Sequence, residues 1–421
     1  MDFELQTTDE QERFRDDVRE WLANNVPDNL VDHPDPADLT ADEYESQREL
    51  GRRLGSMGWL YPSYPVEYGG AGLSFELCMV LEEEMDRYHL AIPPYYDTGG
   101  RLGGASIYVW GTEEQKRFFL PKIFGGHIRT WQLLTEPEAG SDLAGVQSTA
   151  IRDGDDYVIN GQKIYVGSNH GAEYSWMIAR TDPDVPNLRG VSYFICPMDT
   201  PGLELQPIVD MTTAYSFNQT FFTDMELPVD NRIGDENDGW RLAKVTLGNE
   251  RVSLSGEGAL WGSGPSAVDL LDVVRSAGGL SDPTLRDRAA RLHIEGEVLR
   301  LIRLRTLTAR LQGRQPGPEA SVRKALADEH GQNVMHLAKD LMGTHGMLTD
   351  TGPLGGSPLF PTAHAVGEGW QNWHGGFLFS PALTIGGGTR EVQRNIVAER
   401  VLGLPHDIDV QSGQTWSETR G

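Results

Sequence analysis

The sequence predicts an α+β protein of several domains, in which an N-terminal helical domain and a C-terminal helical bundle flank an antiparallel β domain. Apolar residues recur at helical spacing up to about residue 130 and again from Trp240 onward, whereas short β-prone runs separated by turn residues lie between. This order differs from the alternation of strands and helices that builds a parallel sheet. The predicted domains are 1–130, 131–237 and 238–405, followed by a polar tail, 406–421, that we expect to be loose.

Helix start signals support the first domain. Thr8 and Gln11 fit a capping box, in which each side chain bonds the backbone N–H of the other, and an apolar stripe that includes Val18 and Leu22 follows. Thr112 and Gln115 repeat the signature in GTEEQKRFFLPKI. The Pro- and Gly-rich stretch GWLYPSYPVEYGGAGLS between them predicts an ordered loop.

Strand and turn signals support the middle domain. Asn160-Gly161 stands between two β-prone runs in DYVINGQKIYV, which is the strongest short signal for a hairpin turn. Further strands are expected at WMIART, VSYFICPM, LELQPIV and QTFFTDMEL. Breaks in the later helical region are expected at SAGGLSDP, QGRQPGP and HGMLTDTGPLGGSPLFP.

Charge and composition narrow the function. The 421 residues carry 36 basic and 62 acidic side chains, a net charge of -26, which repels nucleic acid and anionic membranes. No apolar run reaches the ~20 residues that a membrane span needs. The start, MDFELQTTDEQERF, has neither the basic nor the apolar region of a signal peptide, so we expect a cytoplasmic protein. Cys78 and Cys196 are too few for a disulfide framework and are expected to be buried.

Several common catalytic motifs are missing. The sequence has no G-x-x-x-x-G-K-[ST] phosphate loop and no G-x-S-x-G elbow. The glycines of GEGALWGSG have the wrong spacing for a dinucleotide loop, and no strand precedes them. His330 and His336 lack the spacing of H-E-x-x-H, so no metal site is expected.

The stretch WQLLTEPEAGSDLAG, residues 131–145, is the most informative. A β-prone run enters a turn that carries Thr135 and Ser141, both small hydroxyl donors. Such a turn exposes successive backbone N–H groups, which suit an anionic or carbonyl-rich ligand. A capped turn, in which Ser141 or Asp142 satisfies the local backbone, explains the same residues equally well.

Five motifs in a fixed order add a resemblance. They are EYGG, GTEEQKRFFLPKI, TEPEAGSD, NGQKIYV and GGGTREVQRNIVAERVLGLP. Together they closely resemble the acyl-CoA dehydrogenase family over nearly the whole chain, and the short bacterial members from β-oxidation and sterol side-chain degradation are the most similar. The resemblance implies the helical–β–helical fold, FAD, an acyl-CoA substrate, an electron-transfer flavoprotein as acceptor, and a homotetramer or a heterotetramer with a homologous chain.

The resemblance also assigns cofactor residues. The family pattern places FAD against a set drawn from the turn, from the strand after NGQK and from the third domain: Gln132, Leu133, Leu134, Thr135, Gly140, Ser141, Tyr165, Val166, Gly167, Arg275, Gly343, Gly346, Thr389 and Glu391. Ser141 is also a candidate for CoA. The family often has Thr or Ser, in contact with flavin N5, where this chain has Gly167. Arg275 is a poor match to an intersubunit Arg-x-x-Phe-Gly segment, and Gly343 or Gly346 is equally explained as a helix C-cap.

The catalytic base departs from the commonest family pattern. Many members have Glu in the loop TIGGGTREVQRN, residues 384–395, at the position of Gly387 here, and a glycine cannot abstract a proton. Other members, including isovaleryl-CoA dehydrogenase, carry the base in a Glu-Arg pair early in the third domain, which matches Glu250 and Arg251. Glu257, two turns further on, is the main rival, and Glu391 is poorly placed for this role.

The rest of the loop keeps its family roles. The backbone N–H of Gly387 is the expected oxyanion donor to the thioester, whereas Arg251 and Gly388 are assigned to substrate binding. Thr389 is expected to cap the final helix.

Alternatives to a dehydrogenase remain open at this point. A non-catalytic subunit that completes FAD sites in a heterotetramer fits Gly387, and a related flavin oxidase or monooxygenase is a third reading. A helix-borne base accompanies bulky acyl groups in the family. Trp370, Trp373 and Phe377 either line a roomy acyl pocket or fill the core, and we favour the core.

Overall fold

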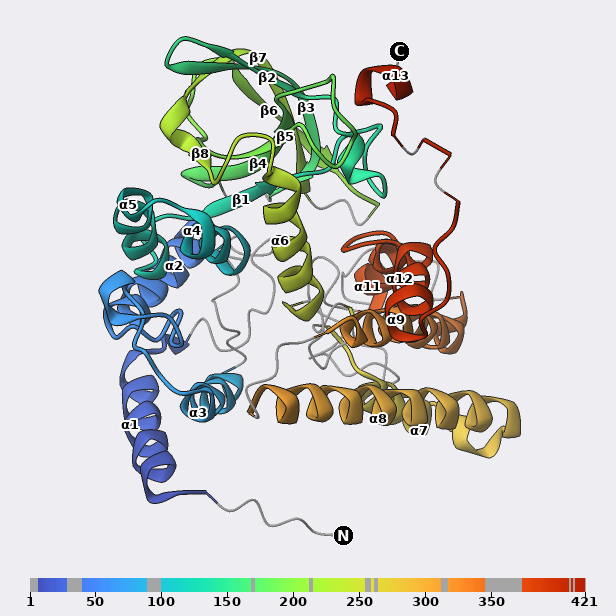
Figure 1. The fold of residues 1–421 in the computed structure, drawn as a ribbon. Coiled ribbons are helices and arrows are strands. Elements are labelled where there is room, and N and C mark those ends of the chain that lie inside the picture. Colours follow the sequence, from blue (N-terminus) through green and yellow to red (C-terminus); the bar gives the residue numbers. More distant parts are fainter. Residues whose placement is uncertain are drawn as a thin grey trace. The chain divides into compact units, whose positions relative to one another are not determined.

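The computed structural model describes residues 7–28, 40–88, 100–167, 171–211, 215–253, 259–260, 264–311, 317–344, 373–408, 410–411 and 413–420 (Figure 1). The described chain forms two compact units. The first unit comprises Met1–Ile208, Phe217–Thr246 and Gln411–Gly421, and the second comprises Val209–Ser216 and Leu247–Val410. The α+β order of helices, sheet and helices predicted from the sequence is confirmed. The predicted boundaries after residues 130, 237 and 405 stay predictions.

The first unit begins with helices whose starts the sequence marks. Thr8 and Thr112 each form the predicted capping box, at the start of α1 and of α5. Val18 and Leu22 of α1 are fully buried. The helical elements of this part are α1 (Asp9–Asn25), α2 (Ala41–Ser56), η3 (Val66–Tyr68), α3 (Phe75–Asp86), η4 (Gly100–Gly104), α4 (Ala105–Trp110) and α5 (Glu113–Phe124). The loop between α2 and α3 is ordered, as expected, and its glycines bring backbones close together: a Cβ at Gly70 would lie 2.1 Å from the Tyr64 carbonyl oxygen.

The sheet of the first unit is mostly antiparallel. Its strands are β1 (Thr130–Leu133), β2 (Thr149–Asp153), β3 (Asp156–Val166), β4 (Tyr174–Arg180), β5 (Val191–Pro197), β6 (Leu203–Val209), β7 (Tyr215–Pro228) and β8 (Arg232–Ile233), with the short helices η5 (Leu143–Gly145) and η6 (Val229–Asn231) between them. The order is β6-β7-β3-β2-β4-β5-β8, and β1 pairs with β4 in parallel (Figure 1). That parallel pair departs from the expectation of a purely antiparallel unit. It aligns Trp131 with Ser175 and Leu133 with Met177, so the strand that enters the TEPEAGSD turn starts from a buried position.

The predicted hairpin at Asn160-Gly161 is wrong. Both residues lie inside β3, and the turn that joins β2 to β3 contains Gly154 instead. Gly161 has a φ of 141° at a register shift against β7, and a Cβ there would lie 2.4 Å from Ser148 Oγ. Asn160 exchanges hydrogen bonds with Asp224 of β7. The Asn-Gly pair therefore makes a bulge with a close backbone approach, for which glycine is also the suitable residue.

The second unit is helical. Its elements are α7 (Ala267–Ser276), η7 (Gly279–Ser281), α8 (Pro283–Leu311), α9 (Glu319–Met342), α11 (Trp373–Phe379), η10 (Ser380–Thr384), α12 (Arg390–Ile396) and η11 (Val397–Val401), and α6 (Gly239–Ser253) enters it from the first unit. Trp373 is 1 % exposed, and Phe377 packs against the same apolar core, as we expected for both; Trp370 lies outside the described residues. Within the described residues, no helix has the length and apolar character to cross a bilayer.

The C-terminal tail is not loose. Residues Trp416–Arg420 form helix α13, and the N–H groups of Trp416 and Ser417 donate to the carbonyls of Val185 (2.8 Å) and Pro183 (2.9 Å). The guanidinium of Arg180 lies 5.1 Å from the centre of the Trp416 ring. The expectation rested on the polar composition of the tail, which contains no sign of this docking onto the loop after β4.

Candidate active site

A buried ion pair connects the TEPEAGSD turn to β3. Glu136 Oε1 lies 2.7 Å from Lys163 Nζ on β3, and the two side chains are 4 % and 0 % exposed. The Glu136 carboxylate also accepts hydrogen bonds from the backbone N–H of Gln147 (2.5 Å) and of Ser148 (3.1 Å). Burial alone raises the pKa of Glu136, but the charge of Lys163 and these donors outweigh it, so the pKa lies below its ordinary value.

The same lysine fixes the backbone beside Thr135. Lys163 Nζ donates to the Leu134 carbonyl at 3.2 Å, and the N–H of Ile164 donates to the Thr135 carbonyl at 2.9 Å. The carbonyls of Leu134 and Thr135 therefore both accept hydrogen bonds from β3, which fixes the orientation of the turn's backbone relative to this strand.

The hydroxyls on this turn are available to a ligand. The side chains of Thr135 and Ser141 neither donate to nor accept from any residue that the structure describes, so the capped-turn alternative finds no support at Ser141. A Cβ placed at Gly140 would meet only Thr135 Cγ2, at 4.0 Å, so the turn is open on that side. Gln132 is half-buried, whereas Leu133, the last residue of β1, and Leu134, just after it, are buried.

The end of β3 presents an aromatic residue. Tyr165 is 61 % exposed and has a φ of 59°, a backbone conformation that is unfavourable for a bulky residue. Its ring meets that of Phe217 edge to face, with centroids 6.0 Å apart. Val166, the next residue, is fully buried. Strain of this kind persists where the surroundings hold the backbone, and it is frequent at functional sites.

Gly167 follows directly and is enclosed by Trp131. Its φ is 62°, and a Cβ there would lie 2.2 Å from Trp131 Cε2 and 2.4 Å from Cδ2. A threonine or serine therefore cannot stand at Gly167 while the indole keeps its place. This contact with the Trp131 indole gives a physical reason why the chain has glycine here, where the family often has threonine or serine.

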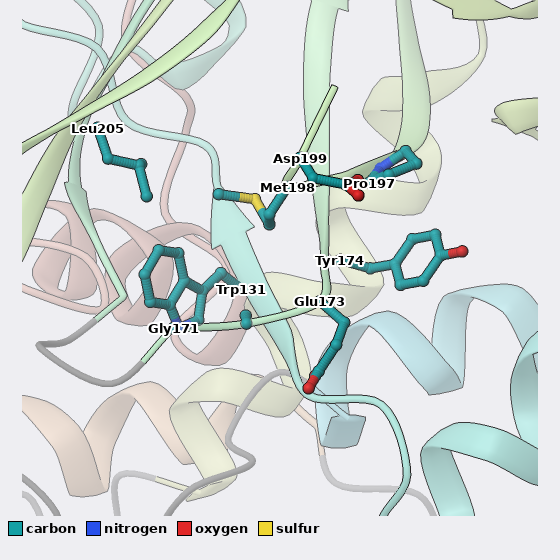
Figure 2. A pocket seen from close by; sticks show the side chains of 9 residues that line it. Trp131, Gly171, Glu173, Tyr174, Pro197, Met198, Asp199 and Leu205 are labelled. Carbon is teal, nitrogen blue, oxygen red and sulfur yellow. The ribbon is translucent and has the colours of Figure 1, made fainter. Parts of the chain in front are cut away.

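Trp131 also lines a pocket of about 460 Å³ in the first unit. In Figure 2, Met198 and Leu205 point toward the indole, whereas Tyr174 points away. Glu173 lies at the wall but is already engaged by Arg48, at 2.7 Å. The buried Nε1 of Trp131 donates to no residue in the described part of the chain.

The loop 384–389 belongs to the second unit. Gly387 and Gly388 have φ values of 65° and 94°, in the region that favours glycine. Their N–H groups bond to no described residue. Thr389 caps α12 as predicted, since its Oγ1 accepts from the N–H of Val392 at 3.2 Å.

The candidate base lies on α6. The backbone of Glu250 and Arg251 is helical, in the last turns of this helix. Their side chains, and the whole of Glu257, lie outside what the structure describes. The helical position is consistent with a helix-borne Glu-Arg pair, and the role of either side chain stays a prediction.

The remaining assigned residues are distributed over the second unit. Arg275, at the end of α7, forms an ion pair with Asp272 three residues before it, at 2.5 Å. Gly343 is the C-cap of α9 with a φ of 55°, so the helix-cap interpretation holds there, and Gly346 lies outside the described residues. Glu391 is exposed and pairs with Arg390 at 3.1 Å, and its assignment to the cofactor stays a prediction.

Sequence reasoning missed the side chains that hold the site in place: Glu136, Lys163, Trp131 and Gln393. Glu136 lies in the motif TEPEAGSD and Lys163 in NGQKIYV, but nothing in the spacing indicates that they pair across 27 residues. Gln393, four residues after Thr389, is 1 % exposed, and a polar side chain so deeply buried is informative once its burial is known.

Known protein families match the chain in both helical parts and in the sheet between them. The sequence matches the acyl-CoA dehydrogenase N-terminal domain over residues 8–127, the middle domain over 132–225 and the C-terminal domain over 237–402. The chain belongs to the acyl-CoA dehydrogenase family of flavin-dependent oxidoreductases, as the resemblance of its motifs implied.

Individual relatives are similar along their full length. Acyl-CoA dehydrogenase IpdE1 of Mycobacterium tuberculosis is 35 % identical over 400 residues, which cover 94 % of this chain and 98 % of the relative. The solved structure of the Tcur3481-Tcur3483 steroid ACAD has a TM-score of 0.75 and 29 % identity, covering 96 % of this chain and 100 % of that one. The ChsE4-ChsE5 complex of M. tuberculosis has a TM-score of 0.72 and 30 % identity, with the same coverage.

The donor set fits the flavin of this family. Thr135 and Ser141 carry hydroxyls that bond to no described residue, Gly140 is open and Tyr165 is exposed. This set matches a ligand with a planar ring and polar edges. No group of three metal-ligating side chains occurs in the described part of the chain, and the proposed chemistry needs none.

Proposed function

We propose that the chain is an FAD-dependent dehydrogenase of a bulky acyl-CoA, which it converts to the trans-2-enoyl-CoA with Glu250 as the base. The observation that carries the proposal is the loop 386–388. It has no carboxylate, but its backbone N–H groups at Gly387 and Gly388 bond to none of the residues that the structure describes.

The chemistry divides between two parts of the second unit. The α-hydrogen of a thioester is weakly acidic, so its removal needs a placed base and donors for the charge that develops on the carbonyl oxygen. Gly387 and Gly388 supply donors without a side chain. Glu250 and Arg251 on α6 supply the carboxylate and a neighbouring positive charge.

The first unit would hold FAD. Thr135 and Ser141 would bind its polar edges, and Tyr165 with Val166 and Gly167 would lie along the ring. FAD, when bound, accepts the hydride that leaves the β-carbon. Because Trp131 closes the space at Gly167, no hydroxyl from that position can reach the ring.

Relatives indicate the substrate class. One solved relative is described as a steroid ACAD, and a helix-borne base accompanies bulky acyl groups in the family. We therefore place a steroid-derived or similarly bulky acyl-CoA in the site. An electron-transfer flavoprotein is the proposed acceptor.

Assembly with a second chain is part of the proposal. Along α8, Ile294, Val298 and Leu301 are 60 %, 41 % and 56 % exposed and stand four and three residues apart. This spacing makes one apolar stripe on the helix surface. Two of the solved relatives are named as pairs of chains, so the partner is either a copy of this chain or a homologue.

A second function has one observation in its favour. Gly387 replaces the loop carboxylate, as expected of a subunit that completes FAD sites without catalysing. In that case Glu250 has no catalytic role, and the active base belongs to the homologous chain.

An anaerobic flavin titration distinguishes these proposals. The purified chain is mixed with a panel of straight-chain and steroid-derived acyl-CoAs, first under nitrogen and then in air. Bleaching under nitrogen by a bulky acyl-CoA is the expected result, with slow recovery of colour in air. Rapid recovery in air identifies an oxidase, and bleaching only after a homologous chain is added identifies the non-catalytic subunit.

A further inference from the structure

Gln393 of α12 holds the two glycines of the loop. It is 1 % exposed, and its Nε2 lies 3.2 Å from the Gly387 carbonyl oxygen and 3.3 Å from that of Gly388. The amide nitrogen therefore lies within hydrogen-bond distance of two successive carbonyls. The contact is close: a Cβ at Gly388 would lie 2.6 Å from this nitrogen.

The hydrogen bond from Gln393 to the Gly387 carbonyl also determines where the next backbone N–H points. The carbonyl and the N–H of one trans peptide point in opposite directions. With the Gly387 carbonyl turned toward Gln393, the N–H of Gly388 points away from it. The N–H of Gly387 belongs to the preceding peptide, which lies between this contact and a turn in which the N–H of Gly386 donates to the Ala382 carbonyl at 2.9 Å.

Neighbouring side chains hold a different part of the segment. Gln332 of α9 donates to the Ser380 carbonyl (3.1 Å) and to Thr384 Oγ1 (3.2 Å). Lys324 of α9 donates to the Leu383 carbonyl at 3.2 Å. Among the side chains that the structure describes, Gln393 alone bonds the backbone of Gly387 and Gly388.

The Gln393 side chain contributes to the loop through its N–H donors and not through its amide oxygen. Gln393 Oε1 is buried, and no described residue forms a hydrogen bond with it, which is unfavourable. A methionine of similar size would fill the same space without a buried, unpaired oxygen. The contribution that a methionine lacks is the pair of N–H groups on the glycine carbonyls.

We infer that Gln393 is the positioning residue that keeps the N–H groups of Gly387 and Gly388 turned toward the thioester carbonyl. The inference rests on the proposed function, because that function assigns the carbonyl to this loop. Without Gln393 the two glycines regain their wide backbone freedom, and the donors lose their fixed direction.

The test compares two glutamines on the same segment. Gln393→Met and the matched control Gln332→Met each remove a side-chain amide, and only the first touches the glycines. The probe is cinnamoyl-CoA labelled with ¹³C at the carbonyl, bound to the holoenzyme. Its carbonyl stretching frequency falls when donors polarise the oxygen, whatever the rate of catalysis.

We expect a lowered frequency in the wild type and in Gln332→Met, and a frequency near that of the free probe in Gln393→Met. Flavin reduction by the active acyl-CoA should fall roughly tenfold or more in Gln393→Met, with little change in KM. A lowered frequency in Gln393→Met, or its loss in both variants, overturns the inference. No lowering in the wild type overturns the proposed function instead.

Gln393→Glu covers the case in which Gln393→Met does not fold. It keeps the shape, and its carboxylate has no donor, whereas its protonated form regains one O–H. The frequency should therefore fall as the pH is lowered in this variant and stay constant in the wild type. A pH-independent lowered frequency in Gln393→Glu contradicts the inference.

Discussion

Lys163 and Glu136 form an ion pair that is closed off from solvent, with Nζ 2.7 Å from Oε1. The pair joins β3 to the turn that carries Thr135. One contact therefore fixes the spacing between two segments that we assign to the flavin: the turn at 135–141, and residues 165–167 at the end of the same strand.

Lys163→Met should destabilise the first unit strongly. It leaves the Glu136 carboxylate buried without its counter-ion, and breaking a buried pair in this way costs about 3 to 5 kcal/mol. Thermal unfolding and FAD retention measure the effect. Adding Glu136→Gln should recover part of the stability, and Lys244→Met, at an exposed lysine, should change neither quantity. Equal unfolding temperatures for Lys163→Met and Lys244→Met would exclude this role.

The same carboxylate should contribute to acid unfolding. Its pKa in the folded state lies below the ordinary value of 4.5, so its contribution to stability is complete above about pH 4.5 and is lost as the pH falls through the folded-state value. Stability measured by urea unfolding between pH 5.5 and 3.5 should therefore fall less steeply in Glu136→Gln than in the wild type. Glu138→Gln, at an exposed carboxylate in the same turn, should keep the wild-type slope; equal slopes for all three proteins would contradict the argument.

Gly167→Thr should not restore a hydroxyl to the site. Its Cβ would lie 2.2 Å from Trp131, at a φ of 62°, so we expect a loss of a few kcal/mol in stability and weak FAD binding. Trp131→Ala removes the clash but not the backbone strain. In a double-mutant cycle, Gly167→Thr should therefore cost less in the Trp131→Ala background. Additive costs would show that the two residues do not interact.

Glu250→Gln should abolish rapid flavin reduction while FAD and acyl-CoA still bind. A lost general base typically costs ~10²-fold to 10⁴-fold in rate, which anaerobic stopped-flow absorbance measures. Gly387→Glu in that background should restore a small part of the rate at most, because the φ of 65° at this position is unfavourable for glutamate. Near-normal reduction in Glu250→Gln, with loss in Glu257→Gln, would transfer the role to Glu257.

Leu301→Glu should weaken assembly. It places a charge in the exposed apolar stripe of α8, and sedimentation should show smaller species than in the wild type. FAD retention should fall in parallel if a second chain completes the site. Ile151→Glu, at a residue that is 65 % exposed on β2, is the matched control and should leave the assembly intact. A Leu301→Glu protein that sediments like the wild type would remove α8 from the interface.

Helix caps, which depend on residues four or fewer positions apart, were predicted correctly from the sequence. The caps at Thr8, Thr112 and Thr389 are present as predicted, because a side chain that bonds an N–H three residues away needs no other part of the chain. The family and the order of helices and sheet also followed from the sequence, since ordered motifs and apolar periods persist along its whole length.

Contacts between distant residues were decided only by the tertiary structure. Asn160-Gly161 has the composition of a hairpin turn, yet pairing with β7 and the approach of Ser148 make it a bulge. Gly167 owes its identity to Trp131, and the tail is ordered by Val185 and Pro183. In each case the partner lies far beyond a single turn along the chain. The local sequence pattern therefore does not indicate the space or the hydrogen bond that the partner provides.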